Sequence, residues 1–272
     1  MIRDITIGQY YPSGSVIHSL DPRTKIIGTI LYIISLFCFR NFFGYLIAAL
    51  FFACIVKISR VPFRFIVKGL KPILFILIFT AALNLLWTPG HVLIKWGILS
   101  ITIEGVRTAL FMVLRMVFLV IGSSMLTLTT TPNQLTDAIE QLLKPLNKLH
   151  VPVHEVAMMM SIALRFIPIL IEETDKIMKA QMSRGADFET GNLFQRLKNM
   201  LPLLVPLFVS AARRAEDLAY AMDARCYHGG EGRTKMKPLQ YQKKDYYSYG
   251  IVILYLVVLF AVVKGTNLLL KW

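Results

Sequence analysis

The sequence YYSYGIVILYLVVLFAVV, residues Tyr246–Val263, contains no charged side chain and consists mainly of large apolar residues. A helix needs about 20 such residues to cross the hydrocarbon core of a bilayer. Tyr246, Tyr247 and Tyr249 stand at the start of the stretch, and tyrosine is enriched where a helix meets the membrane–water interface. This stretch therefore predicts a transmembrane helix, here the C-terminal one within residues 246–272.

The composition places the whole chain in the same class. Apolar residues make up 56% of it and charged residues only 17%, where a soluble domain carries about 25% charged residues. The three cysteines are scattered singles, so neither a disulfide framework nor a zinc site is expected. The first apolar run begins only at Ile26 and lacks a small-residue cleavage site, so no cleavable signal is expected.

Four further apolar runs predict four more spans, which gives an all-α membrane protein with about five transmembrane helices. The four spans are expected within residues 1–131, at about 26–39, 41–57, 72–90 and 105–130. The first two are short and are separated only by Arg40 and Asn41. We expect them to form a tight helical hairpin, with a single kinked element as the alternative.

The distribution of Lys and Arg predicts the orientation of these spans. Of the 30 Lys and Arg residues, only Arg40, Lys95, Lys264 and Lys271 fall on the side opposite the basic loops, while Arg107 and Arg115 lie within a span. The side that carries the basic loops is therefore predicted to be cytoplasmic. The protein would then be a multi-pass protein of the cell membrane with its N-terminus inside and its C-terminus outside. The net charge of +14 is then mainly a topology signal, and no nucleic-acid partner is expected.

Residues 132–245 are too charged to be a membrane span and too apolar to be a loop. Apolar residues recur there at helical spacing, which predicts amphipathic helices at about 132–147, 153–184 and 192–225. Thr131 and Pro132 are suited to the N-cap and first position of the first helix. We expect this segment to lie in the cytoplasm or at the membrane interface.

A short element occurs twice in this segment, 41 residues apart. Ala180–Gly185 reads AQMSRG and Ala221–Cys226 reads AMDARC, and each closes one of the long amphipathic patterns. In each copy an Arg stands between small residues, which would let a guanidinium enter a carboxylate-lined pocket while the backbone approaches closely. The repeat predicts two docking tips for a pair of related cytoplasmic partners. The alternative is that both Arg residues are ordinary helix C-terminal cations.

Other candidate sites are weaker. His150 and His154 are spaced like a metal pair, but Pro152 interrupts the helix that would align them, so interfacial histidines are favoured and no metal is expected. Residues Gly229–Thr234 lack the Gly-Lys-Ser/Thr ending of a phosphate loop, which favours a flexible linker and no nucleotide or other cofactor. Arg115 within a span is either a structural pairing or part of a transport path.

The chain resembles the transmembrane coupling subunit, EcfT or the T component, of energy-coupling factor transporters. The resemblance covers nearly the whole chain: Asp21–Lys25 before the first span, four spans, the two tips and a last span. The family motif is similar to Ala-Arg-Gly at both sites, and the second copy departs from it at Cys226.

The resemblance implies a non-catalytic subunit of an ABC-type importer of vitamins or other micronutrients. It implies two ABC-type ATPases as partners of the tips, here Ser183, Arg184, Gly185, Ala224, Arg225 and Cys226. It also implies a membrane S component that binds the substrate and rests on the apolar faces of the helices, at Met158, Met160, Leu164, Ile167, Leu201, Leu204, Val205 and Phe208. The run Met158–Met160 alone is equally compatible with a helix core. A substrate-binding permease of another type and a membrane scaffold remain the alternatives.

Overall fold

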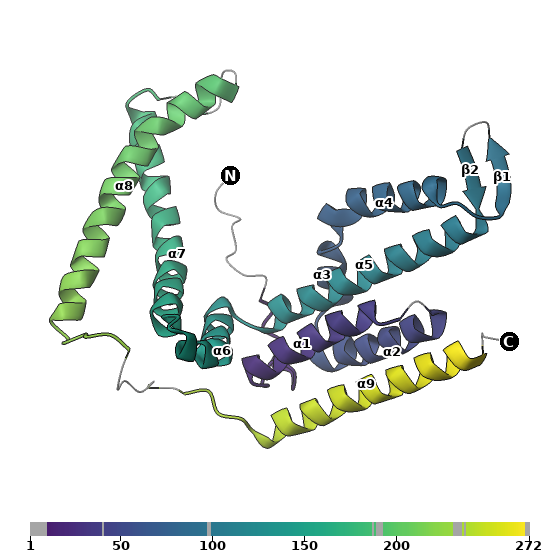
Figure 1. Cartoon of the computed structure of the whole chain (residues 1–272). Helices are drawn as coiled ribbons and strands as arrows, with labels where there is room; N and C mark the ends of the chain where they lie inside the picture. The colour runs from purple at the N-terminus through teal and green to yellow at the C-terminus, as the bar shows by residue number, and fades with distance from the viewer. Residues whose placement is uncertain are drawn as a thin grey trace. The chain divides into compact units, whose positions relative to one another are not determined.

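A computed structural model describes residues 10–39, 41–96, 99–186, 188, 193–230, 236 and 238–269. Its elements are α1 (Pro22–Phe37), α2 (Phe42–Ser59), α3 (Phe63–Lys68), η1 (Lys71–Ile73), α4 (Leu74–Trp87), β1 (Val92–Trp96), β2 (Leu99–Thr102), α5 (Ile103–Thr129), α6 (Pro132–Leu143), η2 (Lys144–Leu149), α7 (Val153–Ser183), α8 (Leu193–Asp223) and α9 (Lys243–Leu269) (Figure 1). The chain forms two compact units. We call the described residues within 8–138 and 239–272 the bundle unit, and the described residues within 139–238 the two-helix unit.

The bundle unit is built around α1, α2, α5 and α9, which run alongside one another, with α4 packed on α5 (Figure 1). Leu36, Ala48, Ile121 and Leu259, one from each of the four helices, are buried together in its core. Many large apolar side chains on the outside of the same helices are exposed, including Phe75 at 79%. An apolar exterior around an apolar core is what a bilayer, rather than water, solvates.

Within the described residues, five helices are long and apolar enough to cross a membrane: α2, α3 through α4 (Phe63–Trp87), α5, α7 and α9 (Lys243–Gly265). The number of candidate spans agrees with the prediction, but α7 is among them and α1 is not. Helix α1 has 16 residues, which rise about 24 Å against a hydrocarbon core of about 30 Å. Helix α7, expected to be interfacial, meets the length and composition limits although it carries a polar face.

The first two predicted spans form separate helices that meet in a tight turn. Helix α1 ends at Phe37 and α2 begins at Phe42; Arg40 between them lies outside the described residues. Arg115 of α5 holds this turn: its Nε donates to the Tyr45 hydroxyl at 3.2 Å and its Nη2 to the Phe39 carbonyl at 3.3 Å. The half-buried cation is thus engaged in a structural pairing between α5 and the α1–α2 turn.

A short hairpin that the sequence analysis did not predict follows α4. Strands β1 and β2 pair antiparallel. The helix expected over 72–90 ends at Trp87, because Thr88 precedes Pro89 and takes an extended conformation with ψ 118°. Thr102 then caps α5 by accepting a hydrogen bond from the Gly105 N–H at 3.0 Å.

The starts of α1 and α9 are joined by buried carboxylates. Asp21 caps α1 by accepting from the Arg23 N–H at 2.9 Å, and Pro22 occupies the first helical position. Asp245 accepts from the Asp21 N–H at 2.8 Å and the Gln242 N–H at 2.7 Å. Burial disfavours the charged form of Asp21, but the hydrogen bonds from Arg23 outweigh it and lower the pKa of this carboxyl.

Two more contacts bring the ends of α2 and α5 to the same place. The Lys25 ammonium donates to the Thr129 carbonyl at 2.9 Å, and the Ser13 hydroxyl donates to the Ser59 carbonyl at 2.7 Å. The starts of α1 and α9 and the ends of α2 and α5 therefore lie at one end of the bundle unit. This arrangement has the parity that the predicted topology requires.

Candidate docking site

The two-helix unit consists mainly of α7 and α8, each 31 residues long. The helices pack side by side (Figure 1). Glu173 of α7 and Arg214 of α8 form an ion pair between Oε2 and Nη2 at 3.3 Å. Beside this pair an apolar hollow is lined by residues of both helices, Ile162 and Phe166 of α7 facing Ala215 and Leu218 of α8 among them. The ion pair and the apolar residues beside it hold α7 against α8.

The first predicted tip is a helix end with a left-handed glycine. Gly185 has φ +87°, and its N–H donates to the Met182 carbonyl at 3.0 Å. The next residue, Ala186, donates its N–H to the Gln181 carbonyl at 3.0 Å. These two bonds are the 5→2 and 6→1 bonds of a Schellman cap. They place Arg184 immediately before the reversal of the chain.

The second tip has the same cap although it lacks the glycine. Cys226 has φ +55°, and its N–H donates to the Asp223 carbonyl at 2.8 Å. Tyr227 donates its N–H to the Met222 carbonyl at 3.1 Å. The bond pattern and the position of Arg225 therefore match those at Arg184, and Cys226 holds a conformation that costs an L-residue roughly 1–2 kcal/mol.

Both tips are accessible. Ser183, Arg184 and Gly185 are exposed, as are Ala224, Arg225 and Cys226. Among the described residues neither guanidinium has a hydrogen-bond or ion-pair partner. Each side chain is thus a planar cation at the end of a helix, available for a bidentate contact with a carboxylate.

The two tips are equally far from the ion pair that joins the helices. Arg184 follows Glu173 by 11 residues and Arg225 follows Arg214 by 11 residues, which is about 16 Å of helix in each case. Figure 1 shows that α7 and α8 end at opposite ends of the pair. We call residues 173–184 at the end of α7 and residues 214–225 at the end of α8 the two arms. The two-helix unit thus presents two similar tips on two arms of equal length.

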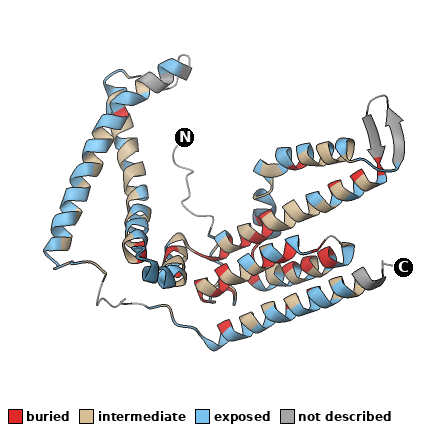
Figure 2. Cartoon of the chain, viewed as in Figure 1, coloured by how far each residue is buried: buried red, intermediate tan, exposed pale blue. Residues whose placement is uncertain are grey.

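The predicted apolar contact faces are largely open to the surroundings (Figure 2). On α7, Met160 and Ile167 are exposed while Met158 and Leu164 are half-buried. On α8, Leu201 and Leu204 are exposed, Val205 is 67% exposed and Phe208 is 75% exposed. Exposed large apolar side chains on these helices suit contact with the bilayer or with another protein.

The base of α7 is fixed by a histidine. Nδ1 of His154 lies 3.0 Å from Oε1 of Glu140, and a Cβ at Gly230 would clash with the same ring. His150 lies apart, in the left-handed conformation that ends η2. No group of three His, Cys, Asp or Glu side chains that could hold a metal occurs in the described part of the chain. Residues 231–234 of the glycine-rich stretch lie outside the described residues.

The sequence analysis did not identify the Glu173–Arg214 pair or the backbone roles of Ala186 and Tyr227. The pair had a signal: residues 173 and 214 are 41 apart, the same offset that relates the two tips. The cap bonds had none, because they are made by backbone N–H groups that any residue except proline supplies.

Comparison with known proteins agrees with the resemblance. Residues 13–236 match the model of the CbiQ family, described as cobalt transport protein. A protein of Ruminiclostridium cellulolyticum is 55% identical over 256 residues, covering 94% of this chain and 96% of that protein. Proteins of Clostridium kluyveri and Bacillus subtilis are 56% and 51% identical over 248 and 246 residues, each covering 90% of this chain and 92% or 93% of the relative. All three are named energy-coupling factor transporter transmembrane protein EcfT.

Proposed function

The chain belongs to the CbiQ family of cobalt transport proteins, and from this premise we propose that it is the transmembrane energy-coupling subunit of an energy-coupling factor transporter. It is a multi-pass membrane protein that works with ATPase subunits and a substrate-binding S component. Its own role is non-catalytic: it transmits the movements of two cytoplasmic ABC-type ATPases to the S component, which carries a vitamin or another micronutrient. A permease that binds substrate itself and a passive scaffold fit relatives named as one component of a transporter less well.

One observation carries the proposal: the two helix ends share one cap geometry although their sequences differ. Gly185 and Cys226 both have positive φ, and both caps have the same pair of backbone bonds. A cap that served only to end a helix would not need an exposed Arg at the same position in both copies. Two equivalent Arg tips suit two ATPases that are related to each other.

The equal arms support a mechanical role for α7 and α8. The Glu173–Arg214 contact is equidistant from the two tips. Movement of the ATPases toward each other would therefore apply similar forces to both arms. The exposed apolar faces of the same helices are the surface that we assign to the S component, at the residues predicted from the sequence. A change in the angle between the helices would then reach the S component directly.

We further propose that the end of the bundle unit that holds Asp21, Ser59, Thr129 and Asp245 faces the cytoplasm. The segment that follows α2, through α3 to the start of η1, carries Arg60, Arg64, Lys68 and Lys71 without an acidic residue. Positive residues of short loops stay on the cytoplasmic side. The N-terminus is then inside and the C-terminus outside.

The test is a substitution of each tip in the complete transporter. Truncating one partner of a desolvated charged pair costs about 2–5 kcal/mol. Arg184→Ala and Arg225→Ala should therefore each weaken copurification of the ATPases, and the double variant should lose them or lose uptake while hydrolysis continues. Lys at either position should restore little, because it cannot make the planar fork.

The matched control is Arg213→Ala, which removes an exposed Arg of α8 away from the cap. It should leave assembly and vesicle uptake unchanged. Wild-type assembly and uptake in the double variant would reduce the two tips to ordinary helix caps and remove the basis of the proposal.

A further inference from the structure

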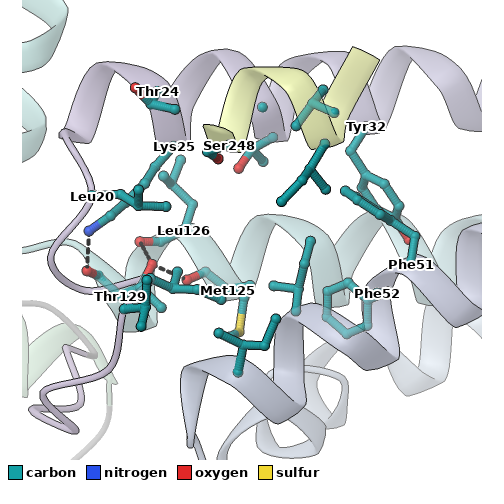
Figure 3. Close-up of a pocket in the computed structure, with 18 of the residues that line it drawn as sticks. Leu20, Thr24, Lys25, Tyr32, Phe51, Phe52, Met125, Leu126, Thr129 and Ser248 are labelled. Carbon is teal, nitrogen blue, oxygen red and sulfur yellow. Dashed lines mark hydrogen bonds between the residues drawn. The ribbon is translucent and has the colours of Figure 1, made fainter. Parts of the chain in front are cut away.

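The bundle unit contains a cavity of about 380 Å³ between α1, α2, α5 and α9 (Figure 3). This volume lies in the range of about 300–1,000 Å³ that is typical of ligand pockets. The lining is mainly apolar, and Tyr32, Phe51 and Phe52 lie at one end (Figure 3). A mainly apolar cavity of this size inside a membrane protein suits hydrocarbon better than water.

The opposite end of the cavity is basic. Lys25 and Lys244 line it there. Lys25 precedes Tyr32 by seven positions on α1, and Lys244 precedes Ser248 by four positions on α9. The distance from Lys25 to Tyr32 along α1 is about 10 Å. Figure 3 shows Lys25, Leu20 and Thr129 together at one side and Tyr32, Phe51 and Phe52 at the other. The cavity is therefore amphipathic along its length.

The local charges favour an anion at the basic end. Four cations and two carboxylates gather there: Arg23, Lys25, Lys243 and Lys244 against Asp21 and Asp245. Both carboxylates are already engaged, Asp21 with Arg23 and Asp245 with two backbone N–H groups. The Lys25 ammonium donates to the carbonyls of His18 and Thr129, which leaves one of its three N–H groups over. Lys244 is exposed and forms no ion pair within the described residues.

Two buried hydroxyls that line the cavity also lack a partner. Thr24 is 3% exposed and Tyr32 is 5% exposed, and neither hydroxyl has a hydrogen bond in the described part of the protein. A buried hydroxyl without a partner costs about 1–3 kcal/mol. A headgroup oxygen beside Thr24, the neighbour of Lys25, would recover part of this cost, whereas an acyl chain beside Tyr32 would not.

We propose that this cavity binds one anionic phospholipid, with an acyl chain between α1, α2, α5 and α9 and its phosphate at Lys25 and Lys244. Basic pockets between transmembrane helices on the cytoplasmic side bind anionic headgroups. Tyr246, Tyr247 and Tyr249 lie at the same end of α9, where tyrosines mark the level of the headgroups. The assignment to the cytoplasmic leaflet rests on the proposed orientation; the site itself does not depend on the role in transport.

The experiment is native mass spectrometry of the purified full chain in nonionic detergent with added dioleoyl phosphatidylglycerol or dioleoyl phosphatidylcholine. Wild-type protein should retain one phosphatidylglycerol and several-fold less phosphatidylcholine. Glycerol 3-phosphate at the same concentration should not displace the lipid, because it lacks the chain that fills the cavity. Displacement by it would mean a phosphate site without a lipid.

Two pairs of variants distinguish binding of the lipid headgroup from binding of the acyl chain. Lys244→Gln should lower phosphatidylglycerol retention about fivefold, while Lys243→Gln, which removes an equal charge from an exposed neighbour outside the cavity, should not. Gly28→Leu should abolish retention of both lipids, because Gly28 lines the cavity and a Cβ there makes only an ordinary contact with Val252. Gly250→Leu, on open helix surface, should leave retention unchanged.

A second measurement on wild-type protein needs no variant to fold. Phosphatidylglycerol with a diazirine in its acyl chain should cross-link to peptides that contain Phe51 and Phe52. Adducts spread over the outer apolar surface, or equal retention of both lipids in all variants, would show annular lipid only and overturn the proposal. Absence of retained lipid would show that the cavity closes or that a protein segment fills it, with the same consequence.

Discussion

Cys226 holds a backbone conformation that glycine adopts without strain. This conformation makes the second tip less stable than it would be with glycine at the same position. Its φ of +55° matches the handedness of Gly185 at the first tip. The left-handed conformation costs a residue with a Cβ roughly 1–2 kcal/mol. The surrounding cap bonds from Cys226 and Tyr227 hold it in place. The second tip is therefore formed at a cost that the first tip avoids.

Cys226→Gly should stabilise this helix end by about 0.5–1 kcal/mol, because the strain disappears while the unfolded chain gains some entropy. The cap and the ATPases should be retained, which thermal unfolding in detergent and copurification would measure. Cys226→Ala is the control: it removes the thiol but keeps the Cβ, so the stability should hardly change. A loss of stability in the Gly variant would mean that the Cys226 side chain stabilises the tip itself.

At the level of elements, the junction of α1 and α9 depends on one buried carboxylate. Asp245 is 1% exposed and accepts two backbone hydrogen bonds, one of them from the cap residue of the other helix. A residue of α9 thus orients the start of α1, although the two are 224 positions apart in the chain. The motif Asp21–Lys25 before the first span has a structural role in this junction.

Asp245→Ala should lower the stability of the bundle unit by about 2–4 kcal/mol, because two charge-assisted bonds are lost and the Asp21 N–H remains buried. Thermal unfolding of the purified chain in detergent would measure this loss. Asp217→Ala, which removes an exposed carboxylate of α8, should have no effect beyond a few tenths of a kcal/mol. Equal stability of the Asp245 and Asp217 variants would exclude the junction as a stabilising element.

The helices α7 and α8 and their ends at Arg184 and Arg225 could be predicted from the sequence because they depend on local signals. Apolar periodicity marks α7 and α8, and the spacing of small residues marks the ends at Arg184 and Arg225. The Asp21–Asp245 junction and the Arg115 contact to the α1–α2 turn could not, since each joins residues that only the packed helices bring together. The β1–β2 hairpin was missed because its residues are as apolar as the spans around them.

Across the whole molecule, one chain combines a bundle unit suited to a bilayer with a two-helix unit that exposes both apolar faces and charged tips. The faces and the tips lie on the same two helices, α7 and α8. Their effects can still be separated by substitution, because the apolar faces involve different side chains from the caps. This separation allows the proposed coupling to be tested in the assembled transporter.

Met160→Asp and Val205→Asp should weaken association with the S component at least about tenfold, because an unpaired charge would be buried in the contact. The ATPases should remain bound, which copurification of all components would show. Ser161→Asp places the same charge on the adjacent position of α7, which is exposed and lies on the polar face, and should be tolerated. Full transport by both apolar-face variants would mean that the S component binds elsewhere.

The equal length of the two arms has a consequence for which sequence changes the helices α7 and α8 tolerate. Each residue added to a helix turns everything beyond it by about 100° and lengthens it by 1.5 Å. One insertion between Glu173 and Arg184 would therefore point that guanidinium away from the direction set by the opposite arm. Substitutions along these 11 positions leave the phase of the tip intact, whereas insertions and deletions do not. On the proposed coupling, the composition of the two arms is free to change, whereas their lengths should stay equal.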